Sequence, residues 1–328
     1  MDTLSTFESW LIRMGGGLLS RGGSSASLLV MIFHRVLGQP DPILPGEPEA
    51  ATFAAQMDLL ARNFTVLPLQ DAVRRLREGR LPPRAVCITF DDGYANNCEI
   101  AMPILCERGL PATVFVAPGF LNGGRMFNDT VIEAVRAAPR DLDLRPIGLD
   151  SFELTDAPAR RHAIGQILGK LKYLAPEERA RRVAAVAESV GVGLPANLMM
   201  TDGQVQKMFR AGIEIGAHTM HHPILASIDA EAARREILQS KRRLEEITGA
   251  AIRSFAYPNG KPAQDYNSTH VALAREAGFE LAVSTSWGAA SRQSDPYQIP
   301  RVAPWDTSAR RYALRMISAY RQRAYRVA

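Results

Sequence analysis

Six short runs of almost continuously apolar residues are spaced along the chain between longer stretches of mixed character. Continuous hydrophobicity, as opposed to strict alternation, is typical of parallel strands that helices cover on both faces. The runs predict strands at residues 28–33, 85–90, 112–117, 213–217, 254–257 and 281–284. The pattern therefore predicts a mostly parallel α/β sheet, either open or closed into a barrel.

Amphipathic stretches between these runs predict helices at 52–63, 69–78 and 96–108. A longer helix is predicted at 229–248, with Asp229 as its N-cap and Gly249 just beyond its end. Because strands and helices alternate, we expect the chemistry at the carboxyl ends of the strands, where the connecting loops converge.

Residues 141–198 interrupt the alternation with two amphipathic stretches, 157–174 and 176–190, which are rich in Arg, Ala and Glu. This segment is predicted to be a helical insertion between the strands at 85–90 and 213–217. Two interpretations stay open. The helices either support the wall of a site from the periphery or form a lid over it.

Both ends of the chain carry apolar residues at helical spacing, which predicts an amphipathic helix within 1–26 and a basic helix within 307–328. The second stretch contains six arginines and no acidic residue. The recurring apolar positions are Phe7, Trp10, Leu11, Met14 and Leu18, and Ala313, Met316, Ile317 and Tyr320. We expect these stripes to pack on their own domain, with docking on an anionic membrane surface as the alternative.

The 328 residues are 46% hydrophobic, which suffices for one barrel-type domain or two smaller ones. A net charge of +5 is mildly basic and requires no nucleic-acid partner. No run reaches the ~18 apolar residues of a membrane span. Asp2 and Glu8 stand where a signal peptide carries basic residues. We therefore expect a cytoplasmic protein, with peripheral contact at the inner membrane as the alternative.

The three cysteines, Cys87, Cys98 and Cys106, show no paired metal-binding spacing and are too few for a disulfide scaffold. We predict that all three are small buried residues in a reducing compartment.

Two adjacent carboxylates, Asp91 and Asp92, directly follow the strand predicted at 85–90. Like charges at a protected strand end raise each other's pKa unless a cation or hydrogen-bond donors compensate. Because neighbouring side chains diverge, one carboxylate can hold a metal ion while the other faces an attacking water. The alternative is a structural turn in which an Asp caps the next helix and Gly93 supplies a positive φ.

Three of the six histidines fall within residues 218–222, after the strand predicted at 213–217. His218 and His222 are four residues apart and can reach one metal ion through neutral ring nitrogens. With a carboxylate they form a two-histidine, one-carboxylate set that leaves positions open for water and substrate. His221 is surplus to this set and is interpreted as a loop residue.

The turn Tyr257-Pro258-Asn259-Gly260 ends the strand predicted at 254–257. Backbone N–H groups in such a turn can point at a developing oxyanion, although an ordinary turn is the alternative interpretation. The polar segments thus follow three different strands, at the edge of the sheet where chemistry is expected.

The motifs at 89–93, 218–222 and 255–260 occur in the order seen in the polysaccharide deacetylase family, which the chain resembles over roughly residues 28–305. This is carbohydrate esterase family four, which includes nodulation-type chitooligosaccharide deacetylases. Thr-Phe-Asp-Asp-Gly paired with His-Thr-x-x-His is a specific combination. The resemblance implies a distorted (β/α) barrel of seven to eight mostly parallel strands over residues 27–306.

Carried onto this chain, the resemblance implies that Asp91 is the general base. It implies that Asp92, His218 and His222 are ligands of a divalent ion, Zn²⁺ first and Co²⁺ or Ni²⁺ as alternatives. It also implies an oxyanion hole at the backbone N–H of Asn259, and from it we expect the adjacent Tyr257 and Pro258 to contact the substrate.

The chain departs from the usual members of the family because it has no late Leu-x-His general acid and no recognisable late Asp that orients the base. The segment around His34 resembles the permuted branch that includes biofilm poly-N-acetylglucosamine deacetylases, in which the acid histidine follows the first strand. This implies His34 as the general acid, with a helper or structural role as the alternative. Asn128 and Asp129 are predicted to touch substrate or cap a helix, and Arg301 to pair with a site carboxylate.

The resemblance implies a metal-dependent hydrolase that removes N-acetyl groups from an acetylated amino-sugar glycan, either an exopolysaccharide or a lipid-linked sugar. An O-acetyl esterase or another amide hydrolase using the same site is one alternative. A glycan-binding protein that has lost the acid step is another. A purely structural metal domain is disfavoured because a structural zinc site uses four protein ligands.

Overall fold

A curled, mostly parallel sheet forms the centre of the computed structural model, which describes residues 4–303 and 306–322. The strand order is β10-β1-β3-β4-β7-β8-β9, and β2 pairs separately with β3. The strands are β1 (Ser27–Phe33), β2 (Thr65–Val66), β3 (Ala85–Phe90), β4 (Thr113–Val116), β7 (Glu214–Ala217), β8 (Ser254–Ala256), β9 (Leu281–Val283) and β10 (Ala290–Ser291). All six predicted strands are confirmed, each to within a residue of its predicted ends.

The two edges of the parallel sheet meet through the segment 299–302. Ile299 forms a parallel bridge to Val283 of β9, and Val302 forms one to Met31 of β1. The first and last parallel strands therefore become neighbours, as a distorted (β/α) barrel requires. This closure places residues that follow β1 beside residues that follow β9.

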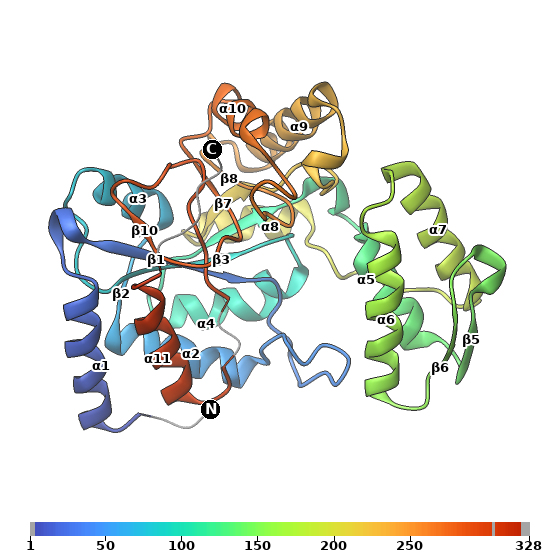
Figure 1. Ribbon diagram of the computed structural model, residues 1–328, viewed down its shortest axis with the longest axis horizontal. Helices are drawn as coiled ribbons and strands as arrows, with labels where there is room; N and C mark the ends of the chain where they lie inside the picture. Colours follow the sequence, from blue (N-terminus) through green and yellow to red (C-terminus); the bar gives the residue numbers. More distant parts are fainter. Residues whose placement is uncertain (1–3, 304–305, 323–328) are drawn as a thin grey trace.

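Helices cover the outside of the barrel, as the continuous hydrophobicity of the strands predicts (Figure 1). They are α1 (Thr6–Leu19), α2 (Ala50–Asn63), α3 (Leu69–Arg77), α4 (Met102–Glu107), α8 (Asp202–Arg210), α9 (Ala230–Thr248), α10 (Ser268–Glu276) and α11 (Ala309–Ala319), with short 3-10 turns at Gly23–Ser25, Pro118–Phe120 and Leu225–Ser227. The predicted caps of α9 are confirmed, because the Asp229 carboxylate accepts from Ala232 N–H and Gly249 has φ 68°.

The helix predicted at 96–108 begins as a π-helix at Asn97–Ala101 and continues as α4. Pro103 stands in the first turn of α4. Proline lacks an N–H and its ring crowds the carbonyl of the preceding turn, so a wider helical turn before it relieves the clash.

Most of the insertion predicted at 141–198 lies in a separate lobe at one side of the barrel, and this lobe begins earlier than predicted, at residue 127, and ends at residue 190 (Figure 1). This insertion lobe, residues 127–190, contains α5 (Phe127–Ala137), α6 (Ala157–Leu171), α7 (Pro176–Ser189), the 3-10 turn Arg145–Ile147 and an antiparallel hairpin of β5 (Asp141–Asp143) and β6 (Ser151–Glu153). The two predicted helices are confirmed, whereas the hairpin was not predicted. The lobe buries its own apolar cluster, which includes Val131, Val135, Ile167 and Val186.

The two terminal helices differ in how they use their apolar stripes. On α11, Ala313, Met316 and Tyr320 are buried, which confirms that this stripe packs on the domain. On α1 the same expectation is wrong. The five stripe residues are 48–66% exposed, while the opposite face, with Ile12 and Gly16, packs inward. Membrane docking by α1 stays a prediction, and no helix among the described residues is long and apolar enough to cross a membrane. Arg323 and Arg326 lie outside the described residues.

The cysteine prediction holds for two of the three residues. Cys87 and Cys98 are buried, and Cys106 is exposed on α4 because it lies on the solvent side of that short helix. All three are free thiols.

Candidate active site

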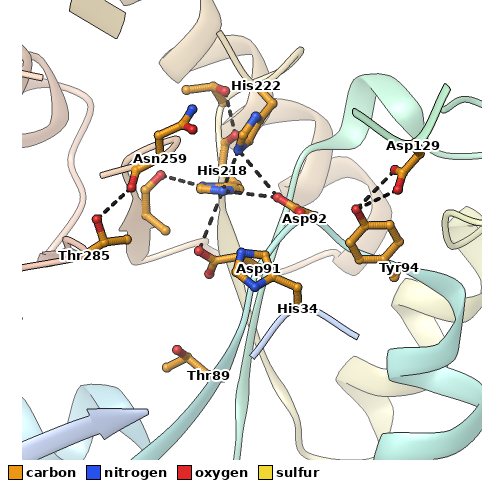
Figure 2. Close-up of polar contacts among 12 residues, drawn as sticks. His34, Thr89, Asp91, Asp92, Tyr94, Asp129, His218, His222, Asn259 and Thr285 are labelled. Carbon is orange, nitrogen blue, oxygen red and sulfur yellow. Dashed lines mark hydrogen bonds and ion pairs between the residues drawn. The ribbon is translucent and has the colours of Figure 1, made fainter. Parts of the chain in front are cut away.

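Asp91 and Asp92 leave the end of β3 in different directions, as predicted for neighbouring side chains (Figure 2). Both are buried. Asp92 has φ 76° and Gly93 has φ 90°. A Cβ on residue 93 would lie 2.9 Å from Val116 Cγ1, so the turn requires glycine there both for space and for its backbone conformation.

Arg301 holds Asp91 through two parallel hydrogen bonds. Its Nη1 donates to Asp91 Oδ1 at 2.6 Å and its Nη2 donates to Oδ2 at 2.7 Å. Arg301 Nε donates to the carbonyl oxygen of Ser284 at 2.9 Å, which fixes the guanidinium plane. Burial alone would raise the pKa of Asp91, but the Arg301 guanidinium outweighs it and holds that pKa below its ordinary value. Asp91 is therefore an ionised carboxylate in a fixed orientation.

The second carboxylate and two histidines converge on one point. Asp92 Oδ1 lies 3.5 Å from Nε2 of both His218 and His222, and the two Nε2 atoms lie 3.1 Å apart. His218 Nδ1 lies 2.7 Å from the carbonyl oxygen of Ala256, so Nδ1 carries the proton and Nε2 presents a lone pair. Asp92, His218 and His222 thus form a group of potential metal ligands, whose donor atoms all lie within 4.8 Å of one another.

The electrostatics of this cluster favour a cation. Burial lowers the pKa of His218, but the negative charges of Asp91 and Asp92 outweigh burial and raise it. Burial, followed by the charge of His218, lowers the pKa of His222. The cluster thus attracts one positive charge to the point where three donor atoms meet, and a divalent ion fits that position. Asp92, His218 and His222 could hold it, and the remaining coordination positions would face the cavity.

The backbone is strained where these side chains are presented. Besides Asp92, positive φ angles occur at Thr219 (60°), His222 (52°) and Asn259 (58°). Such conformations cost roughly 1–3 kcal/mol each for non-glycine residues and persist where the surrounding structure imposes them. Four of the seven non-glycine residues with positive φ in the described chain thus belong to the three predicted motifs.

A cavity of about 430 Å³ opens beside Asp91 and the three potential ligands. Of the predicted residues, His34, Asn128, Asp129 and Asn259 also line it. His34 follows β1 and is exposed, and it lies beside Asp91 because β1 pairs with β3 in parallel, with Phe33 opposite Phe90. Asn259 follows β8 and reaches the same cavity from the other side of the ligand cluster. The carbonyl of Asn259 accepts a hydrogen bond from the Thr285 hydroxyl at 2.7 Å.

Two residues predicted to contact substrate lie elsewhere. The ring of Tyr257 stacks on Tyr266 with centroids 3.9 Å apart, and its hydroxyl donates to the carbonyl of Tyr297. Tyr257 is therefore a core residue, and Pro258 is buried beside it without lining the cavity. Their apolar surfaces pack inward, which corrects the prediction for these two side chains.

His221 stands apart from the ligand cluster, as interpreted from the sequence. It is exposed, and its Nδ1 lies 2.9 Å from the Glu236 carboxylate, which raises its pKa.

Asp129 belongs to a polar group on the far wall of the cavity. The Tyr94 hydroxyl lies 3.1 Å from both carboxylate oxygens of Asp129 (Figure 2), and the Arg35 guanidinium lies over the Tyr94 ring at 4.9 Å. Burial raises the pKa of Asp129 to about 7. Asp129 is thus a carboxyl group that can donate or accept a hydrogen bond near neutral pH.

Several lining residues escaped sequence analysis. These are Arg35, Glu47, Tyr94, Leu168, Lys172 and Thr285. Arg35 directly follows His34, and Tyr94 is two residues after Asp92, so nearness in sequence to predicted site residues could have indicated both. Glu47 lies in an irregular loop, and Leu168 and Lys172 come from the insertion lobe, where no local pattern distinguishes them.

Comparison with known proteins agrees with this geometry. The family described as polysaccharide deacetylase matches residues 78–139 and 152–282, more than half of the chain. The Bacillus subtilis protein YxkH, whose name places it among polysaccharide deacetylases, is 23% identical over 279 residues, covering 84% of this chain and 71% of the relative.

Solved structures show the same fold at low sequence identity. The Streptococcus pyogenes deacetylase PplD, in complex with acetate, superposes with a TM-score of 0.60 at 18% identity, covering 89% of this chain and 98% of that one. IcaB from Ammonifex degensii gives 0.58 at 19% identity, covering 91% and 98%. A de-N-acetylase from Aggregatibacter actinomycetemcomitans gives 0.53 at 16% identity, covering 84% and 94%.

A curled, mostly parallel sheet of distorted-barrel type carries a carboxylate–histidine cluster at its strand ends, which is where hydrolases of this architecture place a metal site. The family match makes the class specific: the chain belongs to the polysaccharide deacetylase family. It is a hydrolase of the carbohydrate-processing kind.

Proposed function

We propose that the protein removes N-acetyl groups from an acetylated amino-sugar glycan with the help of a divalent ion, Zn²⁺ before Co²⁺ or Ni²⁺. One observation carries the proposal: Asp92, His218 and His222 converge on one point, and a second carboxylate, Asp91, lies beside them, held by Arg301. Among the similar structures, one is a de-N-acetylase and another contains acetate, the small product of deacetylation.

A bound divalent ion at Asp92, His218 and His222 would polarise the acetyl carbonyl and make a bound water more acidic. Asp91 is positioned to take the proton of the attacking water. Its Oδ2 lies 3.8 Å from His218 Nε2, on the side of the ligand cluster. Because Arg301 fixes both carboxylate oxygens, Asp91 can act as general base without a change of orientation.

His34 is the proposed acid for the leaving amine. It lines the same cavity as Asp91 and is exposed, so a substrate nitrogen can reach it. The backbone N–H of Asn259 is the proposed donor to the tetrahedral oxyanion. Asn128 and Asp129, on the opposite wall, are proposed to hydrogen-bond sugar hydroxyls. The products are acetate and a free amino sugar.

The test is acetate release from N-acetylated chitooligomers, measured with and without a chelator and after addition of Zn²⁺. We expect release that the chelator abolishes and Zn²⁺ restores. Release from an O-acetylated glycan alone would replace the proposal with the esterase alternative. Release from neither substrate by metal-loaded protein would favour the glycan-binding alternative.

A further inference from the structure

A second cavity, of about 830 Å³, adjoins the catalytic cavity. Phe127 and His222 line both cavities, so the second begins at one of the proposed metal ligands. One wall is helix α7 of the insertion lobe and the facing wall comes from α9 of the barrel and the turn before it. We call this second cavity the α7–α9 groove. A substrate seated at the ligand cluster can extend into it.

The α7 wall of this groove is apolar. It presents Ala180, Val183, Ala184 and Ala187. A sugar placed there would lose the hydrogen bonds of its hydroxyls to water, and these side chains offer none in return. A hydrocarbon chain suits such a wall, because each methylene removed from water contributes favourably.

One charged residue in this wall lacks an anionic partner. Arg179 is only 8% exposed, and among the described residues no carboxylate lies within ion-pair distance of it. Its guanidinium stacks over the Phe127 ring at 4.5 Å and donates one bond to the carbonyl of Lys172 at 3.3 Å. The neighbouring Arg181 and Arg182 on the same helix both pair with Glu178. Burying a guanidinium without an anion is costly, and burial accordingly lowers its pKa.

The other charges around the groove add to this positive character. Arg125 donates to Thr130 and to the carbonyl of Pro195, and both of these partners are uncharged. Of the two acidic residues that line the groove, Glu236 is engaged by His221, and Glu188 is exposed at the rim. An acidic group entering beside Phe127 would meet the Arg179 guanidinium with no carboxylate competing for it.

We propose that the α7–α9 groove binds an apolar chain that is joined to the reacting amino sugar through a phosphate, and that Arg179 contacts that phosphate. This inference rests on the proposed function for the sugar end and adds the class of the remainder of the substrate. The guanidinium fork matches phosphate oxygens in pairs, and the alanine-lined wall accommodates the chain.

The first experiment measures binding without turnover. Decyl phosphate, decyl glucoside and glucose 1-phosphate are titrated into the metal-loaded protein by calorimetry, each below its micelle concentration. They carry chain plus phosphate, chain without phosphate, and phosphate without chain. We expect decyl phosphate to bind at least about tenfold more tightly than either of the others, because it alone uses both features of the groove. Equal affinities for decyl phosphate and decyl glucoside, or no binding of decyl phosphate, would overturn the inference.

Variants then locate the contact. Arg179→Met keeps the length of the side chain and removes its charge, and should weaken decyl phosphate binding about tenfold. Arg181→Met, on the same helix but 77% exposed and paired with Glu178, is the matched control and should bind as the unmodified protein does. Since Arg179 also packs on Phe127, a second variant, Ala184→Phe, fills the groove without touching that contact. It should weaken the binding of decyl phosphate and of decyl glucoside alike.

The outcomes separate the two proposals. Acetate release from chitooligomers depends on the catalytic cavity, whereas decyl phosphate binding depends on the groove. Catalysis with no preference for decyl phosphate would refute the groove inference alone. Tight, Arg179-dependent binding with no acetate release from any acetylated glycan would refute the proposed function alone.

Discussion

The barrel and the insertion lobe contribute opposite kinds of surface to the catalytic cavity. At the barrel end, the two carboxylates of the proposed chemistry already have partners: Asp91 is held by Arg301, and Asp92 faces two histidines. The lobe contributes Asn128, Asp129, Leu168 and Lys172 to the cavity, and Arg179 to the adjoining groove. No anion accompanies Arg179 in the part of the lobe that the structure describes. Side chains whose orientation is already fixed by partners in the protein suit catalysis, whereas a charged side chain without an ion-pair partner suits binding of a charged ligand.

The physical reason lies in how each region is built. The barrel groups follow the ends of buried strands of one parallel sheet, β3 and β7, where backbone pairing fixes each position and strain at Asp92 and His222 can be imposed. The lobe groups sit on helices that pack around a separate apolar cluster. Changes in the barrel should therefore affect the chemical step, and changes in the lobe should affect substrate affinity.

The largest expected effect comes from Asp91→Asn. This substitution should lower kcat by about 10³-fold, because the amide cannot accept the proton of water. The metal content of Asp91→Asn, measured by atomic emission, should stay at about one ion per chain. Asp92→Ala is the matched comparison and should lose the metal together with activity. Loss of metal from Asp91→Asn would contradict the division of roles between the two carboxylates.

Arg301→Met should have the next largest effect. It leaves Asp91 buried without a partner, which should lower the free energy of unfolding by about 3–5 kcal/mol in chemical denaturation. In the unmodified protein the lowered pKa of Asp91 contributes stability above the ordinary Asp pKa, and this contribution is lost as pH falls through the folded value. Without Arg301, burial dominates and the pKa of Asp91 rises.

The acidic limb of kcat/KM against pH should accordingly move to higher pH in Arg301→Met, because the base stays protonated over a wider range. Arg301→Lys keeps a positive charge and should give a smaller displacement. An unchanged pH profile in both variants would show that Arg301 does not set the ionisation of the base.

On the lobe side, Lys172→Met should raise KM about three- to tenfold, with kcat changed less than about twofold, because Lys172 lines the cavity without reaching the reacting atoms. Lys170→Met is the control, since Lys170 pairs with Asp150 at the surface. A loss confined to kcat would place Lys172 in the chemical step and remove the contrast between barrel and lobe.

The smallest effect is expected at α1, far from either wall. If its exposed stripe meets an anionic membrane, Trp10→Glu should reduce co-sedimentation with phosphatidylglycerol vesicles and leave acetate release from soluble chitooligomers unchanged. Equal sedimentation of both proteins would count against a membrane role for α1.

Local pattern was sufficient for the strands, the caps of α9 and the two motifs that supply Asp91, Asp92, His218 and His222. Continuous hydrophobicity in a strand indicates burial on both faces. Adjacent aspartates and two histidines four residues apart are residue types and spacings that suit a metal site. Arg301 was predicted to pair with a site carboxylate, but the sequence did not indicate which one. That partner depends on the bridges of Ile299 and Val302 to the two edges of the sheet.

Other features were decided only by tertiary structure. The packing of Tyr257 on Tyr266, the exposure of Cys106 and the α1 stripe, and the entry of Lys172 into the cavity depend on which surfaces meet after the elements form. Sequence periodicity records that a face is apolar, and it does not record what covers that face. The proposed reacting groups could therefore be identified from the sequence, whereas the walls proposed to bind substrate became visible only once the insertion lobe was placed against the barrel.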